Sequence, residues 1–258
     1  MAMELVKNCK TKAITKTLKR TDVFVDKEMS EQLKKPQGKY ITVETDAVKS
    51  GKRNEFDRVA KEFSCALKEL IIGKSCLIAG LGNPNMTADA LGKKTVQRLM
   101  ITRHLPKDKD TPSVSCVVPN VLGVTGIESF DIVKGVVDRT SPDTVIVIDS
   151  LASAATSRLA AAFQASDAGI TPGSGIGNHR MRFDKGSLGC NVVSIGVPLV
   201  VYASTIIEDA VGANNDGYDK EFASLVVTPK DIDLFVDDCA EIIARAVNIC
   251  FFGDCARE

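Results

Sequence analysis

A short apolar strand that runs directly into a glycine-rich turn constrains the fold of this chain more than any other stretch. Residues 76–92 read CLIAGLGNPNMTADALG, which predicts a buried strand, a turn built on two glycines and Asn83, and then a helix. Thr87 is the expected N-cap of that helix, and Asp89 lies in its first turn. Open α/β sheets build their sites outside the carboxyl ends of such strands. Asp89 is therefore either a functional acid or a residue that stabilises the helix N-terminus electrostatically.

A second apolar run also ends in an aspartate. Residues 144–148, TVIVI, form a continuous β-branched run of the kind expected for a parallel strand buried on both faces. The run ends at Asp149, and the alanine-rich residues 150–162 are predicted to form a helix, which Asp149 could simply cap. Because parallel strands point the same way, we also expect Asp89 and Asp149 to lie on one edge of the sheet.

Two carboxylates on one rim could work in either of two ways. They do not both ionise readily when they lie close together, so one retains a proton near neutral pH. Such a pair can activate water with one member and protonate a leaving group with the other. The pair could alternatively hold a metal, because carboxylates suit hard cations.

The remaining sequence alternates between helical and strand patterns. Apolar residues at helical spacing predict helices over 54–72, 127–139 and 230–250, and the apolar run 192–203 predicts a further strand. Strand and helix alternate without an internal repeat. This pattern predicts a single three-layer α/β/α domain with a mainly parallel central sheet, spanning residues 23–258.

The first 22 residues form a basic N-terminal arm. Six lysines and arginines stand against the single acid Glu4 within the first 20 residues. The simplest interpretation is a solvated arm, and the alternative is a removable or docking segment. At its end, the stretch from Arg20 to Asp26 alternates polar and apolar residues, as an extended segment or edge strand does.

Composition excludes several functional classes. The chain has 33 basic and 33 acidic residues, so no global charge favours nucleic-acid binding. No apolar run approaches the roughly 18 residues that a membrane span needs, and the N-terminus lacks the apolar core of a signal peptide. The eight cysteines include no CxxC pair, which indicates a reducing, cytoplasmic setting. The two histidines, His104 and His179, are too few for a histidine-rich metal site, and we expect no cofactor.

A glycine-rich loop, GITPGSGIGN, occupies residues 169–178. It lacks the GxGxxG spacing and follows a predicted helix, so it does not support dinucleotide binding. Its glycines let the backbone approach a substrate, although an ordinary loop would have the same composition. Asn83 is expected to orient substrate or a carboxylate by hydrogen bonds. The candidate substrate-binding residues are Asn83, Gly173, Ser174, Gly175 and Asn178.

Five longer segments carry a family resemblance. They are GLGNPNMTADALG (80–92), VIDSLAS (147–153), SDAGITPGSGIGNHR (166–180), SIGVPLVV (194–201) and VTPKDIDLFVDDCAEIIA (227–244). In this order they resemble the germination proteases of endospore-forming bacteria. The resemblance covers most of the chain from about Arg20 onward.

The resemblance implies an endopeptidase that degrades small acid-soluble spore proteins in the spore core, with no direct nucleic-acid or membrane partner. It implies a zymogen with a short propeptide, a homotetramer, and a fold like that of the hydrogenase maturation proteases. The family's two functional aspartates fall on Asp89 and Asp149. The segment RTDVFVD, which begins at Arg20, Thr21 and Asp22, is similar to the propeptide junction.

The chain departs from the family pattern at several positions. Ala88 and Lys93 stand where the family commonly has proline, Ser150 stands where it has alanine, and Pro84 replaces a bulky aromatic residue. These departures bear on substrate preference and zymogen control more than on the fold or the acid pair. Two alternatives therefore stay open, a metal-dependent maturation-type endopeptidase and a spore-protein-binding domain without catalytic activity.

Overall fold

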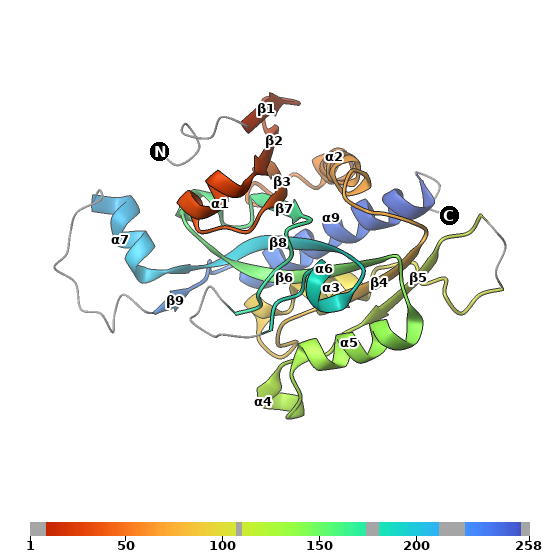
Figure 1. Cartoon of the computed structure of the whole chain (residues 1–258). Coiled ribbons are helices and arrows are strands. Elements are labelled where there is room, and N and C mark those ends of the chain that lie inside the picture. Colours follow the sequence, from red (N-terminus) through yellow and green to blue (C-terminus); the bar gives the residue numbers. More distant parts are fainter. Residues whose placement is uncertain (1–8, 107–109, 174–180, 212–224, 254–258) are drawn as a thin grey trace.

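The computed structural model describes residues 9–106, 110–173, 181–211 and 225–253 (Figure 1). Its centre is one mixed sheet in the order β1-β2-β3-β7-β8-β6-β4-β5, and β9 pairs with β8. The strands are β1 (Cys9–Ala13), β2 (Leu18–Val25), β3 (Gly38–Thr45), β4 (Ser75–Gly80), β5 (Ser113–Val117), β6 (Thr144–Ser153), β7 (Ala162–Ser166), β8 (Asn191–Tyr202) and β9 (Val226–Val227).

The sheet has two halves that differ in strand direction. In the parallel half, β8, β6, β4 and β5 run the same way. In the antiparallel half, β1, β2, β3 and β7 alternate in direction, and β7 joins β8 in antiparallel pairing. The predicted strand over 144–148 is confirmed, and its residues are buried on both faces. The predicted α/β class with a parallel central sheet is therefore also confirmed.

Helices cover both faces of the sheet. The longer described helices are α2 (Phe56–Lys68), α5 (Ser129–Thr140), α7 (Ala203–Val211) and α9 (Ile232–Phe252). The shorter ones are α1 (Lys27–Leu33), α3 (Leu91–Val96), α4 (Leu122–Thr125) and α6 (Lys185–Leu188), with single turns η1 (Arg53–Glu55), η2 (Thr87–Asp89) and η3 (Thr156–Arg158). In the described part of the chain, no helix has the length and apolar character to cross a membrane.

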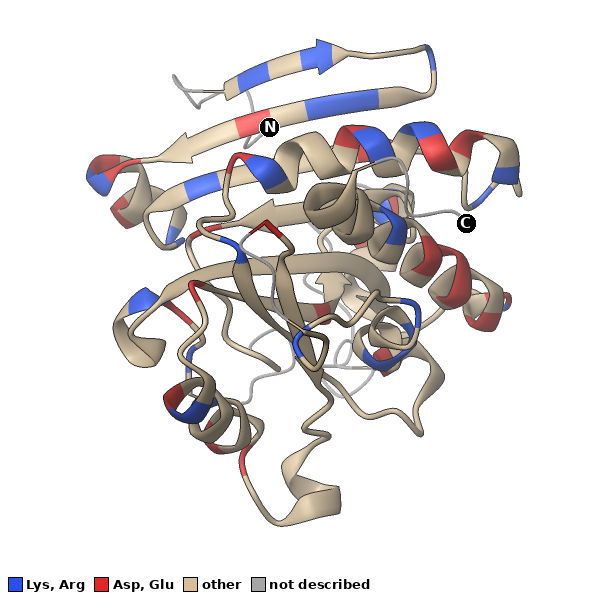
Figure 2. Cartoon of the chain, turned by 90° about the vertical axis from the view of Figure 1, so that its right-hand side faces the viewer, with Lys and Arg blue, Asp and Glu red and all other residues tan. Residues whose placement is uncertain are grey.

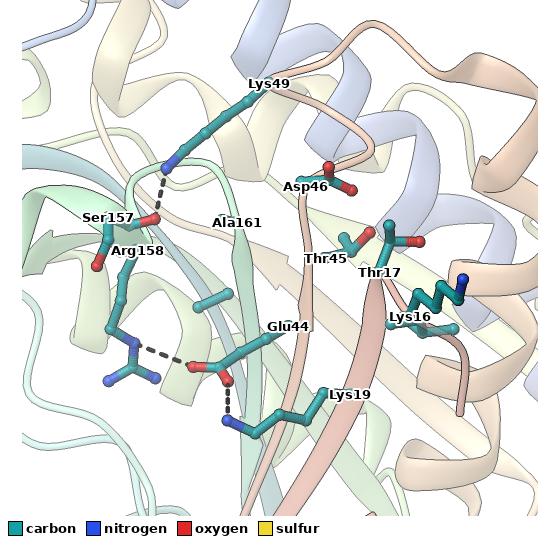
Figure 3. A pocket seen from close by; sticks show the side chains of 12 residues that line it. Lys16, Thr17, Lys19, Glu44, Thr45, Asp46, Lys49, Ser157, Arg158 and Ala161 are labelled. Carbon is teal, nitrogen blue, oxygen red and sulfur yellow. Dashed lines mark hydrogen bonds and ion pairs between the residues drawn. The ribbon is translucent and has the colours of Figure 1, made fainter. Parts of the chain in front are cut away.

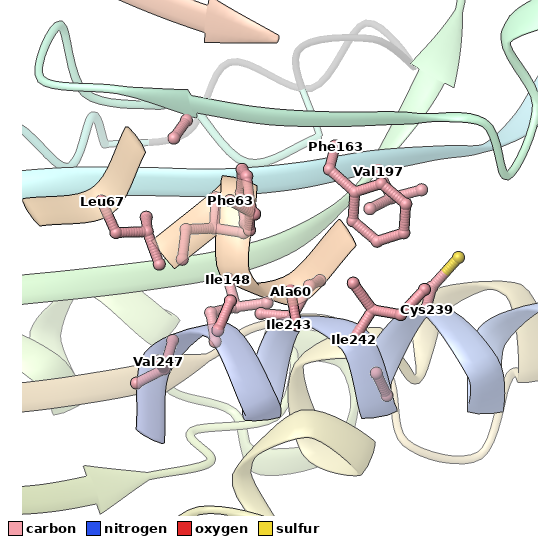
Figure 4. Close-up of a cluster of buried hydrophobic side chains, with 14 of the residues drawn as sticks. Ala60, Phe63, Leu67, Ile148, Phe163, Val197, Cys239, Ile242, Ile243 and Val247 are labelled. Carbon is pink, nitrogen blue, oxygen red and sulfur yellow. The ribbon is translucent and has the colours of Figure 1, made fainter. Parts of the chain in front are cut away.

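The layers meet in two apolar clusters. Figure 4 shows Phe63 and Leu67 of α2 beside Ile148 of β6 and Ile243 and Val247 of α9, all in the larger cluster. The smaller cluster lies on the opposite face, where α5 packs on the alternate side chains of β4 and β6. Because successive side chains of a strand point to opposite faces, the same two strands supply both clusters.

The helix predicted over 150–162 is wrong. β6 continues to Ser153, whose partner on β8 is Val201, and the chain then passes through η3 into β7. Alanine has a high helix propensity, but here the long β8 offers backbone partners that outweigh this local preference. Asp149 therefore does not end its own strand. It lies one residue beyond Ile148, which pairs with the last residue of the neighbouring β4, Gly80.

The prediction of a solvated arm is also wrong for the described part of it. Residues 9–25 form the β1–β2 hairpin, and β2 pairs with β3 on its other side. Leu18 is only 2% exposed and belongs to the larger apolar cluster, and Thr21 is buried as well. β2 is therefore an internal strand of the sheet, and β1 is the edge.

Candidate active site

A cavity of about 520 Å³ opens where β4 ends in the parallel half. Its walls come from the turn after β4, from β6 and β8, and from the loop before α6. Asp89 and Asp149 both line it. The expected meeting of the two acids is therefore found, although the strand that carries Asp149 is longer than predicted.

The turn after β4 is built closely around Asp89. The backbone N–H of Asn83 donates to Asp89 Oδ2 at 2.6 Å, and the Asn83 side-chain oxygen accepts the N–H of Asn85. Gly82 has a φ of +94°, and a Cβ at this position would lie 2.1 Å from the Asp89 carbonyl oxygen. Only glycine allows this approach. Thr87 begins η2 without a side-chain capping bond, so it is not the predicted N-cap.

Asp149 is held within the sheet. Asp149 is 6% exposed, and its Oδ1 accepts a hydrogen bond from the Ser150 N–H at 3.0 Å. In the cross-strand register, Asp149 pairs with Gly196 of β8, and Gly196 pairs with Gln164 of β7. Paired residues project to the same face, so Asp149 and Gln164 flank a position that has no side chain. Gln164 also lines the cavity.

The rest of the cavity wall combines apolar surface with a few polar groups. Leu81, Leu151 and Pro198 supply apolar surface. Ser150 lines the cavity too, and its buried Oγ has no hydrogen-bond partner among the described residues. Pockets of this character bind through apolar contact while a few polar groups fix orientation. The cavity can therefore hold a peptide segment beside the two carboxyl groups.

The structure places the other predicted site residues in different regions. Gly173 lines the cavity, whereas Ser174, Gly175 and Asn178 lie outside the described residues. Asn83 is not part of the cavity wall and reaches Asp89 through its backbone amide.

The three residues predicted at the propeptide junction do not line the cavity. β2, which carries them, is separated by β3 from β7, whose Gln164 lines it. Arg20 instead forms ion pairs with Asp22 at 2.8 Å, Glu69 at 2.7 Å and Glu62 at 3.7 Å. Thr21 faces Thr11 across the hairpin, with 3.2 Å between their hydroxyl oxygens.

Sequence patterns missed several residues of the cavity wall. Lys35 precedes β3, Arg158 ends η3, and Gln164 belongs to β7. Arg158 lies in the stretch wrongly predicted as a helix, no strand was predicted around Gln164, and Lys35 carried no pattern that points to a site. Only a correct prediction of β7 and of its pairing with β8 would have identified Gln164.

The described residues include no group of three or more histidine, cysteine, aspartate or glutamate side chains placed to share a metal. If a hard cation such as Mg²⁺ bound in the cavity, Asp89 and Asp149 would supply its carboxylate ligands. Mg²⁺ often binds one or two carboxylates and several waters.

The buried cysteines do not support a thiolate nucleophile. All the described ones are free thiols. Burial raises the pKa of Cys76 and Cys239 and raises that of Cys250 to about 11. A thiol with a raised pKa carries little of the nucleophilic thiolate at neutral pH.

Comparison with known proteins places the chain among peptidases. The family model described as germination protease matches residues 4–223. The germination protease of Clostridium perfringens is 36% identical over 92% of this chain and 86% of its own length. The Bacillus subtilis germination protease is 34% identical over 93% of this chain and 85% of its own length. Among solved structures, the hydrogenase maturation protease HycI from Thermococcus kodakarensis matches 70% of this chain and 98% of its own, with 18% identity and a TM-score of 0.39.

Proposed function

Because this chain belongs to the germination protease family, we propose that it is an endopeptidase that degrades small acid-soluble spore proteins in the spore core. We further propose that Asp89 and Asp149 are its catalytic residues. One observation carries this assignment: both acids line a single cavity of about 520 Å³ that has room for a peptide segment.

In the proposed reaction, a water molecule attacks the carbonyl carbon of the scissile peptide bond. One aspartate, ionised, takes a proton from this water, and the other, protonated, gives its proton to the amide nitrogen as the C–N bond breaks. The proposal requires one of the two to keep a proton, as one of a pair of adjacent carboxyl groups does because two close negative charges repel one another. The scheme holds with either aspartate in either role.

Other groups on the wall suit the binding of an extended peptide. The Ser150 hydroxyl and the Gln164 amide offer hydrogen bonds, and Leu151 and Pro198 offer apolar contact for a substrate side chain. Holding the peptide against the two acids supplies the proximity that a bimolecular attack by water would otherwise lack.

Asparagine substitutions test the assignment of the two acids. Asp89→Asn and Asp149→Asn each remove an acid–base group with little change of shape, so cleavage of a spore protein should fall on the order of 10²- to 10⁴-fold. The matched control is Asp138→Asn, which changes an exposed aspartate on α5 that pairs only with Lys134 among the described residues. Circular dichroism and thermal unfolding should show an intact fold in all three. Full activity in either active-site variant would refute the assignment.

The two alternative functions predict different results in the same assay. A metal-dependent peptidase would lose activity in chelator and regain it when a divalent cation is added. A domain that only binds spore proteins would leave the substrate intact, which mass spectrometry of the mixture would show. Cleavage products formed in the presence of chelator support the metal-free mechanism.

We also propose that the chain is made as a zymogen that is cut near Arg20, Thr21 and Asp22. The similarity of RTDVFVD to the family's propeptide junction supports this position. N-terminal sequencing before and after activation tests it, and full activity of a chain that still begins at Met1 would contradict it.

A homotetramer is the proposed assembly. Leu122, Val124 and Ile127 are exposed apolar residues on and just after α4, and an interface between subunits would cover such residues. Sedimentation analysis of the full chain gives the oligomeric state directly, and a monomer at micromolar concentration would exclude a stable tetramer.

A further inference from the structure

A second cavity, of about 470 Å³, lies on the antiparallel half and is rich in cations (Figure 3). We call it the basic pocket. Its cationic residues come from three separate segments of the chain: the hairpin turn and β2, the loop after β3, and η3. They are Lys16, Lys19, Lys49 and Arg158.

The carboxylates of the basic pocket neutralise only part of this charge. Glu44 pairs with Lys19 at 3.0 Å and with Arg158 at 3.5 Å. Asp46 also lines the pocket and pairs with Lys52, a residue outside it, at 3.4 Å. Four cations against two carboxylates leave two positive charges on the wall.

Two of the cations lack a counter-ion. In the part of the chain that the structure describes, neither Lys16 nor Lys49 is paired with a carboxylate. Lys49 instead reaches across the pocket and donates to the backbone oxygen of Ser157 (Figure 3). Partial burial lowers the pKa of Lys49, because an ammonium group loses hydration there without gaining a negative partner.

The guanidinium of Arg158 also has unused hydrogen-bonding capacity. Its Nε is buried and makes no hydrogen bond among the described residues, although Glu44 is its ion-pair partner. Ammonium and guanidinium groups bind phosphate and carboxylate anions through charge-assisted hydrogen bonds.

We propose that the basic pocket binds a small anion with two or more negative charges, of the class of inorganic phosphate. Lys49 and Arg158 are the principal ligands, and the Lys16 side chain, which points away from them in Figure 3, turns toward the anion from the hairpin. The anion would join the N-terminal hairpin to η3. Arg158 also lines the cavity of the two aspartates, so an occupied pocket fixes a residue on that rim. The proposal does not depend on the peptidase assignment.

Calorimetric titration of the full chain with inorganic phosphate at low ionic strength tests the proposal. We expect saturable binding of one phosphate per chain. The double variant Lys16→Ala, Lys49→Ala should bind at least tenfold more weakly, whereas Lys49→Arg should retain most of the affinity.

The matched control is Lys10→Ala, Lys12→Ala, which removes two exposed lysines from β1 of the same hairpin that do not line the pocket. It should bind phosphate as the unchanged chain does. Equal weakening in both double variants would show general charge attraction and overturn the proposal, as would the absence of saturable binding in the unchanged chain. Thermal unfolding confirms that all variants are folded.

Discussion

The two halves of the sheet are held together by different means. In the parallel half, β4 and β6 are buried on both faces. The backbone of β4 at Gly80 is in direct contact with the backbone of α3 at Gly92. In the antiparallel half, β1 and β2 carry several charged residues (Figure 2), and ion pairs centred on Arg20 connect β2 with α2 and the residue after it. The first half should therefore be sensitive to added volume, and the second to charge, salt and pH.

The strongest test of this contrast is a pair of glycine substitutions. Gly82→Ala places a methyl group 2.8 Å from Asp89 Oδ1, so we expect it to displace the carboxylate and lower activity about 10²-fold. Gly51→Ala is the matched control from the loop after β3. Its φ is also left-handed, at +64°, but nothing lies within 4 Å of the added Cβ. Peptidase assays compare the two, and equal activity would break the contrast.

Packing in the parallel half gives the next effect. In Gly92→Ala the new Cβ lies 2.5 Å from backbone atoms of Gly80 and Leu81. Such overpacking should lower the free energy of unfolding by about 1–3 kcal/mol, although alanine is the better helix former. Gly135→Ala, at an open position of α5, should instead stabilise by up to about 1 kcal/mol. Urea unfolding measures both, and a stabilising Gly92→Ala would contradict the close packing.

The antiparallel half should respond to the loss of charge. Arg20→Ala removes the partner of three carboxylates, so we expect a loss of about 1–2 kcal/mol that shrinks at high salt. Lys12→Ala is the control, because Lys12 is an exposed cation that lies opposite Arg20 in the strand register of the hairpin. Unfolding at low and high ionic strength should separate the variants, and a loss that does not depend on salt would assign the effect to packing alone.

The smallest effect concerns pH. Burial alone would raise the pKa of Glu69, but hydrogen bonds from Lys39 and Arg20 outweigh it and lower the pKa. Stabilisation from Glu69 is therefore complete above its unfolded pKa of about 4.3 and is lost as the pH falls through the lower folded value. Glu69→Gln should cost stability at pH 7 and less in acid. Glu31→Gln on α1 should show no such trend, and identical pH profiles would refute the link.

The parallel half was also the part that the sequence predicted. Residues 144–148 and the strand before Gly80 are local apolar runs, and a buried parallel strand needs no other signal. The positions of Asp89 and Asp149 were predicted from the same two runs, because the carboxyl ends of parallel strands lie at one edge of the sheet. Both acids could therefore be placed on one rim from local patterns alone.

β7 and the extension of β6 were missed for a physical reason, whereas the extended pattern from Arg20 to Asp26 falls on β2. β7 and the extension of β6 exist because β8 is long enough to pair with both, and such distant pairing has no local signature. The alanine-rich segment after Asp149 favoured a helix, and only the tertiary contacts overrule it. Arg158 and Gln164 reach the cavity through these same connections and were missed with them.

The position of Thr21 has a consequence for any maturation event. This residue is bonded into the sheet from both sides, opposite Thr11 on β1 and Thr42 on β3. A protease takes its substrate as a free extended segment, so no enzyme can cut here until β2 of the hairpin separates from both β1 and β3. When opening and closing are fast, the cutting rate follows the fraction of time the hairpin spends open. Contacts that close the hairpin, such as those of Leu18 and Arg20, would then determine when the mature chain appears.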